Sequence, residues 1–228
     1  MFNLLVSVIV VTKNSERTLK RCLDSISEQT YLPIEIIVVD AESTDGTIKI
    51  LKNYNIKHIA VNQNTSIGSA RQVGFNNSNG EIIAYIDSDV ELPHHKWIVN
   101  MCKPFSNPAV AGVQTLAKCR DSDPAILKKV HSKFEYKNRY IDIDNYEPVG
   151  TSHLLLRRIA ISSVGGFIDS NFGEDVDLTL KIMNQGHGFV YLKNEKCYHH
   201  HVSGYKSYLK KSIRNKYYGI KFAVCGKR

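Results

Sequence analysis

The chain has 228 residues, of which 43% are hydrophobic and 23% are charged, so it is long enough to fold as one domain with a sizeable core. This balance excludes a disordered or low-complexity protein. The net charge of +8 is uneven: the last 33 residues hold nine Lys or Arg and no acidic residue, whereas the first 195 hold 21 basic and 22 acidic side chains. A nearly neutral domain with a basic end indicates contact with a local anionic surface.

Neither the cysteines nor the N-terminus indicates an exported protein. The five cysteines are widely spaced and none forms a C-x-x-C pair, which favours a reducing compartment over a disulfide framework or a zinc site. The apolar stretch at residues 4–11 is far shorter than the roughly 20 residues of a membrane-spanning helix and lacks the flanks of a secretory signal. We expect a cytoplasmic protein, located at the inner face of the cell membrane if its basic end binds lipid.

The first half of the chain alternates strand and helix signals. Apolar, β-branched runs predict buried strands at residues 7–11, 34–39, 57–61 and 82–86. Apolar residues at helical spacing predict helices between them, with Ser15 as the N-cap of the first and Ser66 as the N-cap of the third. Strands that alternate with helices pair in parallel, so the sequence predicts a three-layer α/β/α sandwich with a mostly parallel central sheet.

The second half gives weaker signals. They predict a helix at 124–138, an acidic and aromatic loop at 140–148, a short strand at 154–156, a tight turn at 165–166, a helix at 174–185 ended by Gly186, and a strand at 189–192 followed by a turn. In parallel α/β sheets, ligands bind beyond the carboxyl ends of the strands. Polar residues that directly follow a predicted strand are therefore the first candidates for a site.

Asp87, Ser88 and Asp89 directly follow the predicted strand at 82–86. If this segment is extended, residues two apart share a face, so both carboxylates point the same way and Ser88 points back. Two adjacent like charges repel unless a cation lies between them, and Mg²⁺ or Mn²⁺ suits such oxygen ligands. The plainer alternative is a solvated acidic turn.

Several motifs, taken together and in order, resemble those of the family 2 glycosyltransferases. They lie at residues 7–15, 22–26, 35–40, 43–47, 68–71, 85–89, 165–167 and 173–178. The resemblance covers residues 5–202 and implies a GT-A fold, a nucleotide-sugar donor and an inverting transfer. It implies a single catalytic domain at 1–202, with a Rossmann-like nucleotide-sugar-binding half at 1–115 and an acceptor and catalytic half at 116–202, followed by a basic amphipathic tail at 203–228.

The resemblance also implies a donor pocket. Asp40, at the end of the second predicted strand, would bind the nucleoside base or ribose, and Asp87 with Ser88 would face the ribose or sugar. Many members have a second acidic residue directly after this aspartate, whereas here Ala41 is followed by Glu42, which leaves the identity of the nucleoside base open. The other residues expected to line this pocket are Thr12, Asn14, Glu42 and Arg71. The alternatives are that Asp40 is only a turn residue and Arg71 only a surface cation.

By the same resemblance, Asp89 with Asp87 would hold Mn or Mg on the diphosphate of the donor. The cation would neutralise the charge that grows on this leaving group as the glycosidic bond breaks. A histidine often completes such a site, and in the run of three histidines His199 matches best and His201 is the second choice. A fortuitous solvated run is the alternative.

Glu174, Asp175 and Asp177 lie at the start of a predicted helix. Direct displacement at the anomeric carbon needs a general base for the acceptor hydroxyl, and Asp175 matches the family's base. Its neighbour Glu174 would position it, and Asp177 would contact the acceptor. Acids are also favoured in the first turn of any helix because they face the positive end of its dipole.

The basic tail gives the expectation about partners. Its aromatic and apolar residues recur at helical spacing beside a stripe of Lys and Arg, as in helices that lie on anionic membranes; a helix packed on the domain is the alternative. We therefore expect a glycan or polyprenyl-phosphate-linked acceptor and no nucleic acid, with UDP favoured over GDP in the donor. The competing hypothesis is a non-catalytic protein that binds nucleic acid or an anionic surface through this tail.

Overall fold

The computed structural model describes residues 4–118, 138–147 and 149–200. Three expectations lie outside these residues: nearly all of the helix at 124–138, the second-choice metal ligand His201, and the basic tail at 203–228. Within the described part of the chain, no helix combines the length and the apolar character that crossing a bilayer requires.

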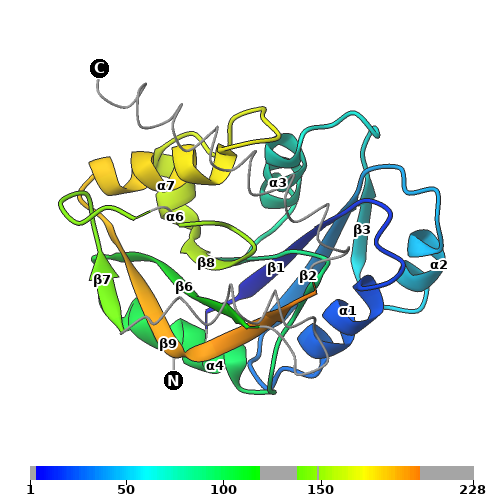
Figure 1. Cartoon of the computed structure of the whole chain (residues 1–228), viewed down its shortest axis with the longest axis horizontal. Coiled ribbons are helices and arrows are strands. Elements are labelled where there is room, and N and C mark those ends of the chain that lie inside the picture. The colour runs from blue at the N-terminus through cyan, green and yellow to red at the C-terminus, as the bar shows by residue number, and fades with distance from the viewer. Residues whose placement is uncertain (1–3, 119–137, 148, 201–228) are drawn as a thin grey trace.

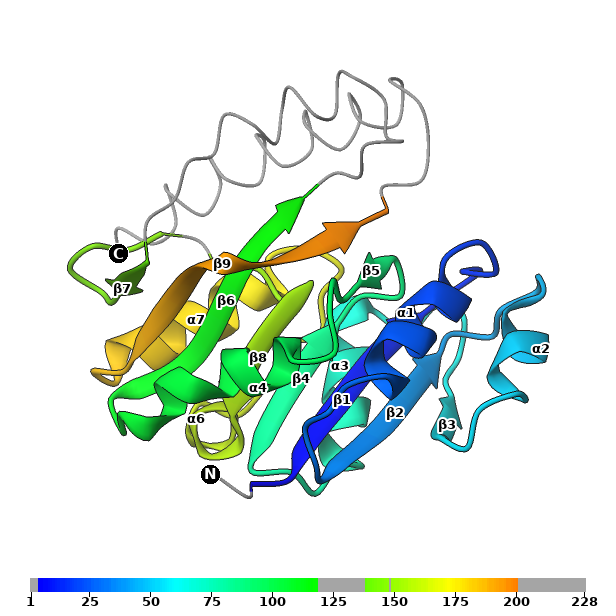
Figure 2. The same cartoon turned by 90° about the horizontal axis from the view of Figure 1, so that it is seen from below.

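The described residues form a nine-stranded sheet at the centre of the molecule (Figures 1 and 2). The strands are β1 (Val6–Thr12), β2 (Ile34–Asp40), β3 (Lys57–Ala60), β4 (Ile82–Ile86), β5 (Val90–Glu91), β6 (Val110–Lys118), β7 (Arg139–Ile141), β8 (His153–Arg157) and β9 (Gly188–His199). Their order is β3-β2-β1-β4-β8-β6-β9-β5, and β7 pairs with β9. The strands β1 to β4 are parallel, β8 is antiparallel to both β4 and β6, and β9 is parallel to β6.

Helices cover both faces of this sheet, which confirms the predicted three-layer fold. They are α1 (Leu19–Ser27), α2 (Thr47–Leu51), α3 (Ile67–Asn76), α4 (Trp97–Cys102), α6 (Arg158–Ser163) and α7 (Glu174–Asn184). In Figure 1, α3, α6 and α7 lie above the sheet and α1 and α4 below it. Alternate residues of β1 enter the two cores: Val8 and Val10 pack with α1 and α4, and Ile9 packs with α6 and α7.

The expected cap of the first helix is wrong, whereas that of the third is confirmed. Helix α1 begins at Leu19, because residues 16–18 form a turn in which the Ser15 carbonyl accepts the N–H groups of Thr18 and Leu19. The Ser66 hydroxyl accepts the backbone N–H of Ser69, 3.1 Å away, at the start of α3.

Two expectations for the second half also need correction. The strand expected to stop at residue 192 continues to His199, because β9 pairs with β6 along one side and with β7 and β5 along the other. The segment 140–148, expected as a loop, begins inside β7. These pairings join residues far apart in the sequence, so the local pattern does not show them.

The loop that leads into α7 packs on the N-terminus of α3. The backbone N–H of Gly68 donates to the Ser170 carbonyl, 3.0 Å away. The hydroxyls of Ser66 and Ser69 donate to the Asp169 carboxylate at 2.5 and 2.7 Å. These bonds fix the start of α7 against α3, although the two helices are about a hundred residues apart in sequence.

Gly68 should not tolerate a side chain. A β-carbon there would lie 2.1 Å from the backbone carbonyl oxygen of Ile168. Such overpacking typically costs about 1–3 kcal/mol, whereas the better helix propensity of Ala returns at most about 1 kcal/mol. We expect Gly68→Ala to lower the free energy of unfolding, measured by urea denaturation. The control is Gly150→Ala, whose β-carbon has its nearest heavy atom at 3.4 Å. Equal stabilities of the two variants would contradict the role of this contact.

Candidate active site

The ends of β1, β2 and β4 meet at one edge of the sheet, as the sequence predicts. Thr12 and Asp40 are paired in register at the last positions of β1 and β2, and Asp87 follows β4 directly. The backbone N–H of Asp87 donates to the Ser152 carbonyl, 2.9 Å away, in the segment just before β8. The sheet therefore brings polar groups from both halves of the chain to this edge.

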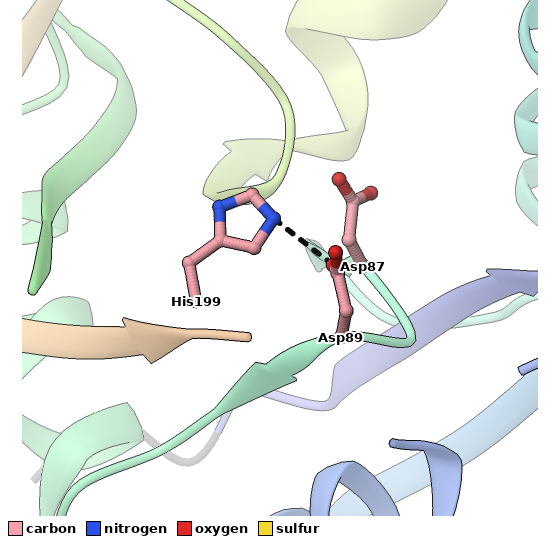
Figure 3. Close-up of side chains that lie close together, drawn as sticks. All are labelled: Asp87, Asp89 and His199. Atoms are coloured by element: carbon pink, nitrogen blue, oxygen red, sulfur yellow. Dashed lines mark ion pairs between the residues drawn. The ribbon is translucent and has the colours of Figure 1, made fainter. Parts of the chain in front are cut away.

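Asp87 and Asp89 come together, but not for the reason expected. The segment is a turn, closed by the Val90 N–H donating to the Asp87 carbonyl at 2.9 Å, so the extended geometry assumed from the sequence is wrong. Ser88 lies in this turn, and its hydroxyl is 2.9 Å from that of Ser15 in the loop after β1. The turn still brings the two carboxylates to the same side as His199 (Figure 3).

His199 completes a group of three possible metal ligands. One ligand atom each of Asp87, Asp89 and His199 lies within 4.8 Å of the others. The His199 Nε2 atom is 3.0 Å from Asp89 Oδ1, and the close-up shows the imidazole directed at the carboxylates (Figure 3). Two carboxylates and one imidazole are a donor set that fits Mn²⁺, and Mg²⁺ also accepts the carboxylates.

Arg71 joins this group to α7. Its guanidinium is buried, with 5% of the side chain exposed, and it donates to Glu174 Oε1 at 2.5 Å and to Asp87 Oδ1 at 3.1 Å. Burial alone would lower the pKa of Arg71, but the carboxylates of Asp87 and Glu174 hold this pKa above its usual value. The sequence analysis places Arg71 in the pocket for the nucleoside base. In the structure it lies between Asp87, directly after β4, and Glu174 in the first turn of α7.

The acids of α7 have three different surroundings. Glu174 is buried, and its pKa is raised first by burial and then by the charge of Asp175. Asp175 is half-buried, and its Oδ1 accepts the adjacent Val176 N–H at 2.8 Å. Asp177 forms an ion pair with Lys181 at 2.7 Å, one turn further along the helix. Asp175 therefore keeps a carboxylate oxygen that this local bond does not use.

The candidate base pocket is built around Asp40. This carboxylate is buried, and it accepts both the backbone N–H of Ser43, at 2.9 Å, and the Ser43 hydroxyl, at 2.5 Å. Next to it in register, the Thr12 hydroxyl is buried and has no hydrogen-bond partner among the described residues. A buried polar group without a partner is uncommon and needs an explanation, such as a ligand.

Asn14 and Glu42 lie in the loops that follow β1 and β2. Both have left-handed backbones, with φ of 50° and 46°, which is uncommon for residues other than glycine. Asn14 Oδ1 accepts the Thr44 N–H at 2.8 Å, and Glu42 Oε2 accepts the Gln63 N–H at 3.1 Å. In this structure both side chains therefore tie neighbouring loops together at the pocket.

His153 is a residue of this edge that the sequence did not indicate. It is buried at the start of β8, where burial lowers its pKa to about 4. Its Nε2 donates to the Thr115 carbonyl at 2.8 Å, so its Nδ1 accepts the Ser152 hydroxyl, also at 2.8 Å. It thereby fixes the segment whose carbonyl holds the Asp87 backbone. Finding it requires the pairing of β8 with β4 and β6, which no local motif shows.

The fold defines a class of protein. Two solved structures are similar to it: a mannosyltransferase from Pyrobaculum calidifontis in complex with GDP-Man and Mn²⁺, and TarS from S. aureus in complex with UDP-GlcNAc. Each has a TM-score of 0.71 and 22% identity; the first match covers 91% of this chain and 60% of the other, the second 87% and 59%. The chain has the GT-A glycosyltransferase fold.

The sequence gives the family. The model of the family described as Glycosyl transferase family 2 matches residues 7–164, and the chain belongs to this family. Similar proteins include the glycosyltransferase AglE of Haloferax volcanii, 25% identical over 194 residues, and the O-antigen chain rhamnosyltransferase RfbN of Salmonella typhimurium, 23% identical over 208 residues. These matches cover 82% and 86% of this chain but 64% and 66% of the relatives, so the chain spans less than two thirds of their length.

Proposed function

We propose that residues 1–202 form the catalytic domain of a metal-dependent, inverting glycosyltransferase that uses a nucleoside-diphosphate sugar. The observation that carries this proposal is the contact of the buried Arg71 guanidinium with both Asp87 and Glu174. It joins the candidate metal ligand Asp87 to Glu174, the residue directly before the candidate general base. The halves at 1–115 and 116–202 share a single sheet, so we treat them as one domain.

In this proposal the divalent cation is held by Asp87, Asp89 and His199. Bound there, Mn²⁺ or Mg²⁺ would offset the charge that develops on the departing nucleoside diphosphate. The charge of the site supports a cation: the carboxylates of Asp87, Glu174 and Asp175 act on one buried guanidinium, and the carboxylate of Asp89 lies beside that of Asp87. The Mn²⁺ named with the Pyrobaculum mannosyltransferase agrees with this choice.

Asp175 is the proposed general base. It would accept the proton of the acceptor hydroxyl as that oxygen attacks the anomeric carbon from the face opposite the leaving group, which inverts the configuration. Glu174 would position this base through its contact with Arg71, and Asp177 would contact the acceptor. The carboxylate oxygen of Asp175 that makes no local helix bond is available for this role.

The donor nucleoside would lie in the pocket around Asp40. The unpartnered Thr12 hydroxyl supports a ligand there, and Asn14 and Glu42 would border it. We retain UDP as the favoured nucleotide over GDP; the names of the similar structures include both GDP-Man and UDP-GlcNAc. The acceptor would be a glycan or a polyprenyl-phosphate-linked glycan, which the O-antigen role in the name of RfbN and the basic charge of residues 203–228 support.

A panel of nucleotides tests this function. We expect one of UDP, GDP, CDP and dTDP, together with Mn²⁺ or Mg²⁺, to raise the stability of the protein. A ligand at 100 times its dissociation constant stabilises by about 2.7 kcal/mol, which a thermal unfolding assay detects. Asp89→Asn is the control, because it should remove the metal-dependent part of the shift. If no nucleotide stabilises the protein with either metal, the proposed function is wrong.

A further inference from the structure

His200 binds the segment of β5 at two points. Its backbone N–H donates to the Asp89 carbonyl at 2.7 Å, and its imidazole Nε2 lies 2.8 Å from Glu91 Oε2. Between these two contacts, Val90 pairs with His199 in the antiparallel ladder of β5 and β9. His200, which directly follows the candidate ligand His199, therefore binds the segment that carries the candidate ligand Asp89.

The contact between His200 and Glu91 is shielded from water. The exposed fractions are 12% for the His200 side chain and 19% for that of Glu91. A part-buried hydrogen bond of this kind holds geometry better than an exposed ion pair, which solvent screens. Both side chains have limited freedom to move, so the end of β9 stays aligned with β5.

Glu91 lies on the same short segment as Asp89, two residues further along the chain. A third carboxylate close to a cation site competes for the cation or disorders its ligands unless another group binds it. His200 occupies an oxygen of Glu91, while Asp87, Asp89 and His199 form the group of possible ligands.

We propose that His200 and Glu91 are positioning residues that hold Asp89 and His199 in the geometry that binds a divalent cation, a proposal that rests on the metal site of the proposed function. Neither residue is itself a ligand in this arrangement. Hydrogen bonds from residues that do not bind the metal orient the residues that do, and their loss typically weakens metal binding by about 10–100-fold.

The direct test is the affinity for Mn²⁺ alone, measured by the loss of the electron paramagnetic resonance signal of free Mn²⁺. We expect His200→Ala and Glu91→Ala each to raise the Mn²⁺ dissociation constant by about 10–100-fold. The double variant should lose little more than either single variant, because both changes remove the same contact. His200→Gln, whose amide can still donate to Glu91, should recover part of the affinity.

The chain offers a matched control. His94 Nε2 lies 3.0 Å from Glu195 Oε2 and joins the segment after β5 to strand β9, and neither residue belongs to the group of candidate ligands. His94→Ala removes a pair of the same chemistry, and we expect it to leave the Mn²⁺ affinity unchanged. Thermal unfolding of all variants shows whether the fold itself has been altered.

Each outcome decides the matter. If the wild type binds Mn²⁺ and the variants at His200 and Glu91 bind it equally well, this proposal is wrong and the metal site stands. Equal weakening by His94→Ala, or loss of folding in both single variants, would assign the pair to general stability and overturn the proposal. A wild type that does not bind Mn²⁺ overturns the metal site and the proposal together.

Discussion

Asp175→Asn is expected to lower the rate of sugar transfer by about 10²–10⁴-fold, the usual contribution of a general base. Asn has nearly the same shape as Asp but cannot accept the proton of the acceptor hydroxyl. Among the described residues, the half-buried Asp175 side chain forms no hydrogen bond or ion pair with the candidate metal ligands, so donor binding should persist. The measurement is kcat and donor KM for transfer from the nucleotide sugar that the nucleotide panel identifies.

Asp177→Asn is the comparison for this prediction. It makes the same change of charge in the same helix, but its carboxylate is paired with Lys181 and is proposed to contact the acceptor. We expect it to act mainly on the acceptor KM, whereas Asp175→Asn acts on kcat. A near-normal kcat for Asp175→Asn, once wild-type transfer has been demonstrated, would remove Asp175 as the base.

Arg71→Met is expected to destabilise the fold by about 3–5 kcal/mol, because removing one partner of a buried ion pair leaves an uncompensated charge. The carboxylate that loses its partner is that of Glu174, whose side chain is 7% exposed. The double variant Arg71→Met/Glu174→Gln should recover much of the loss, since it removes that charge as well. Urea denaturation at a fixed pH measures the free energy of unfolding of each variant.

Lys20→Met is the control for the loss of Arg71. It breaks an ion pair with Asp24 whose side chains are 70% and 41% exposed, and such pairs are worth about 0–1 kcal/mol. An equally small loss in Arg71→Met would contradict the view that Arg71 supports a buried charge.

The destabilisation by Arg71→Met should also depend on pH. The pKa of Glu174 is already raised by burial, and Arg71 is one of the groups that lower it, so the variant raises it further. A group with a raised pKa in the folded state stabilises at low pH and loses this contribution as the pH rises through the folded pKa. The gap in stability between wild type and variant should therefore narrow as the pH falls. A gap that widens in acid would contradict the assignment to Glu174.

Local patterns predict the edge of the sheet that carries Asp40 and Asp87, but they do not predict which distant residues contact this edge. Buried strands and the residues just after them are readable from apolar runs, so Asp40 and Asp87 were placed at the correct edge. The contact of Arg71 with Glu174 joins positions 103 residues apart, and that of His200 with Glu91 joins positions 109 apart. No local period specifies which distant groups meet, because packing of whole elements decides it.

The turn at Asp87–Asp89 corrects the geometry that the sequence predicts for this segment. The local pattern favoured an extended segment, but the hydrogen bond from Val90 to Asp87 closes a turn. The turn brings the two carboxylates together, and the pairing of β5 with β9, which is two residues long on the β5 side, brings His199 to them. So short a strand leaves almost no sequence signal of its own.

Because of the bonds between α3 and the loop before α7, a division of the chain at residue 115 separates segments that contact each other. By position, α3 belongs to the proposed donor-binding half, yet Gly68 and Arg71 attach it to the segment that carries the candidate general base. If two family members exchanged their halves at residue 115, the α7 helix of one protein would pack against the α3 helix of the other. A chimera that keeps these contacts needs residues 66–71 and residues 168–174 from the same parent protein.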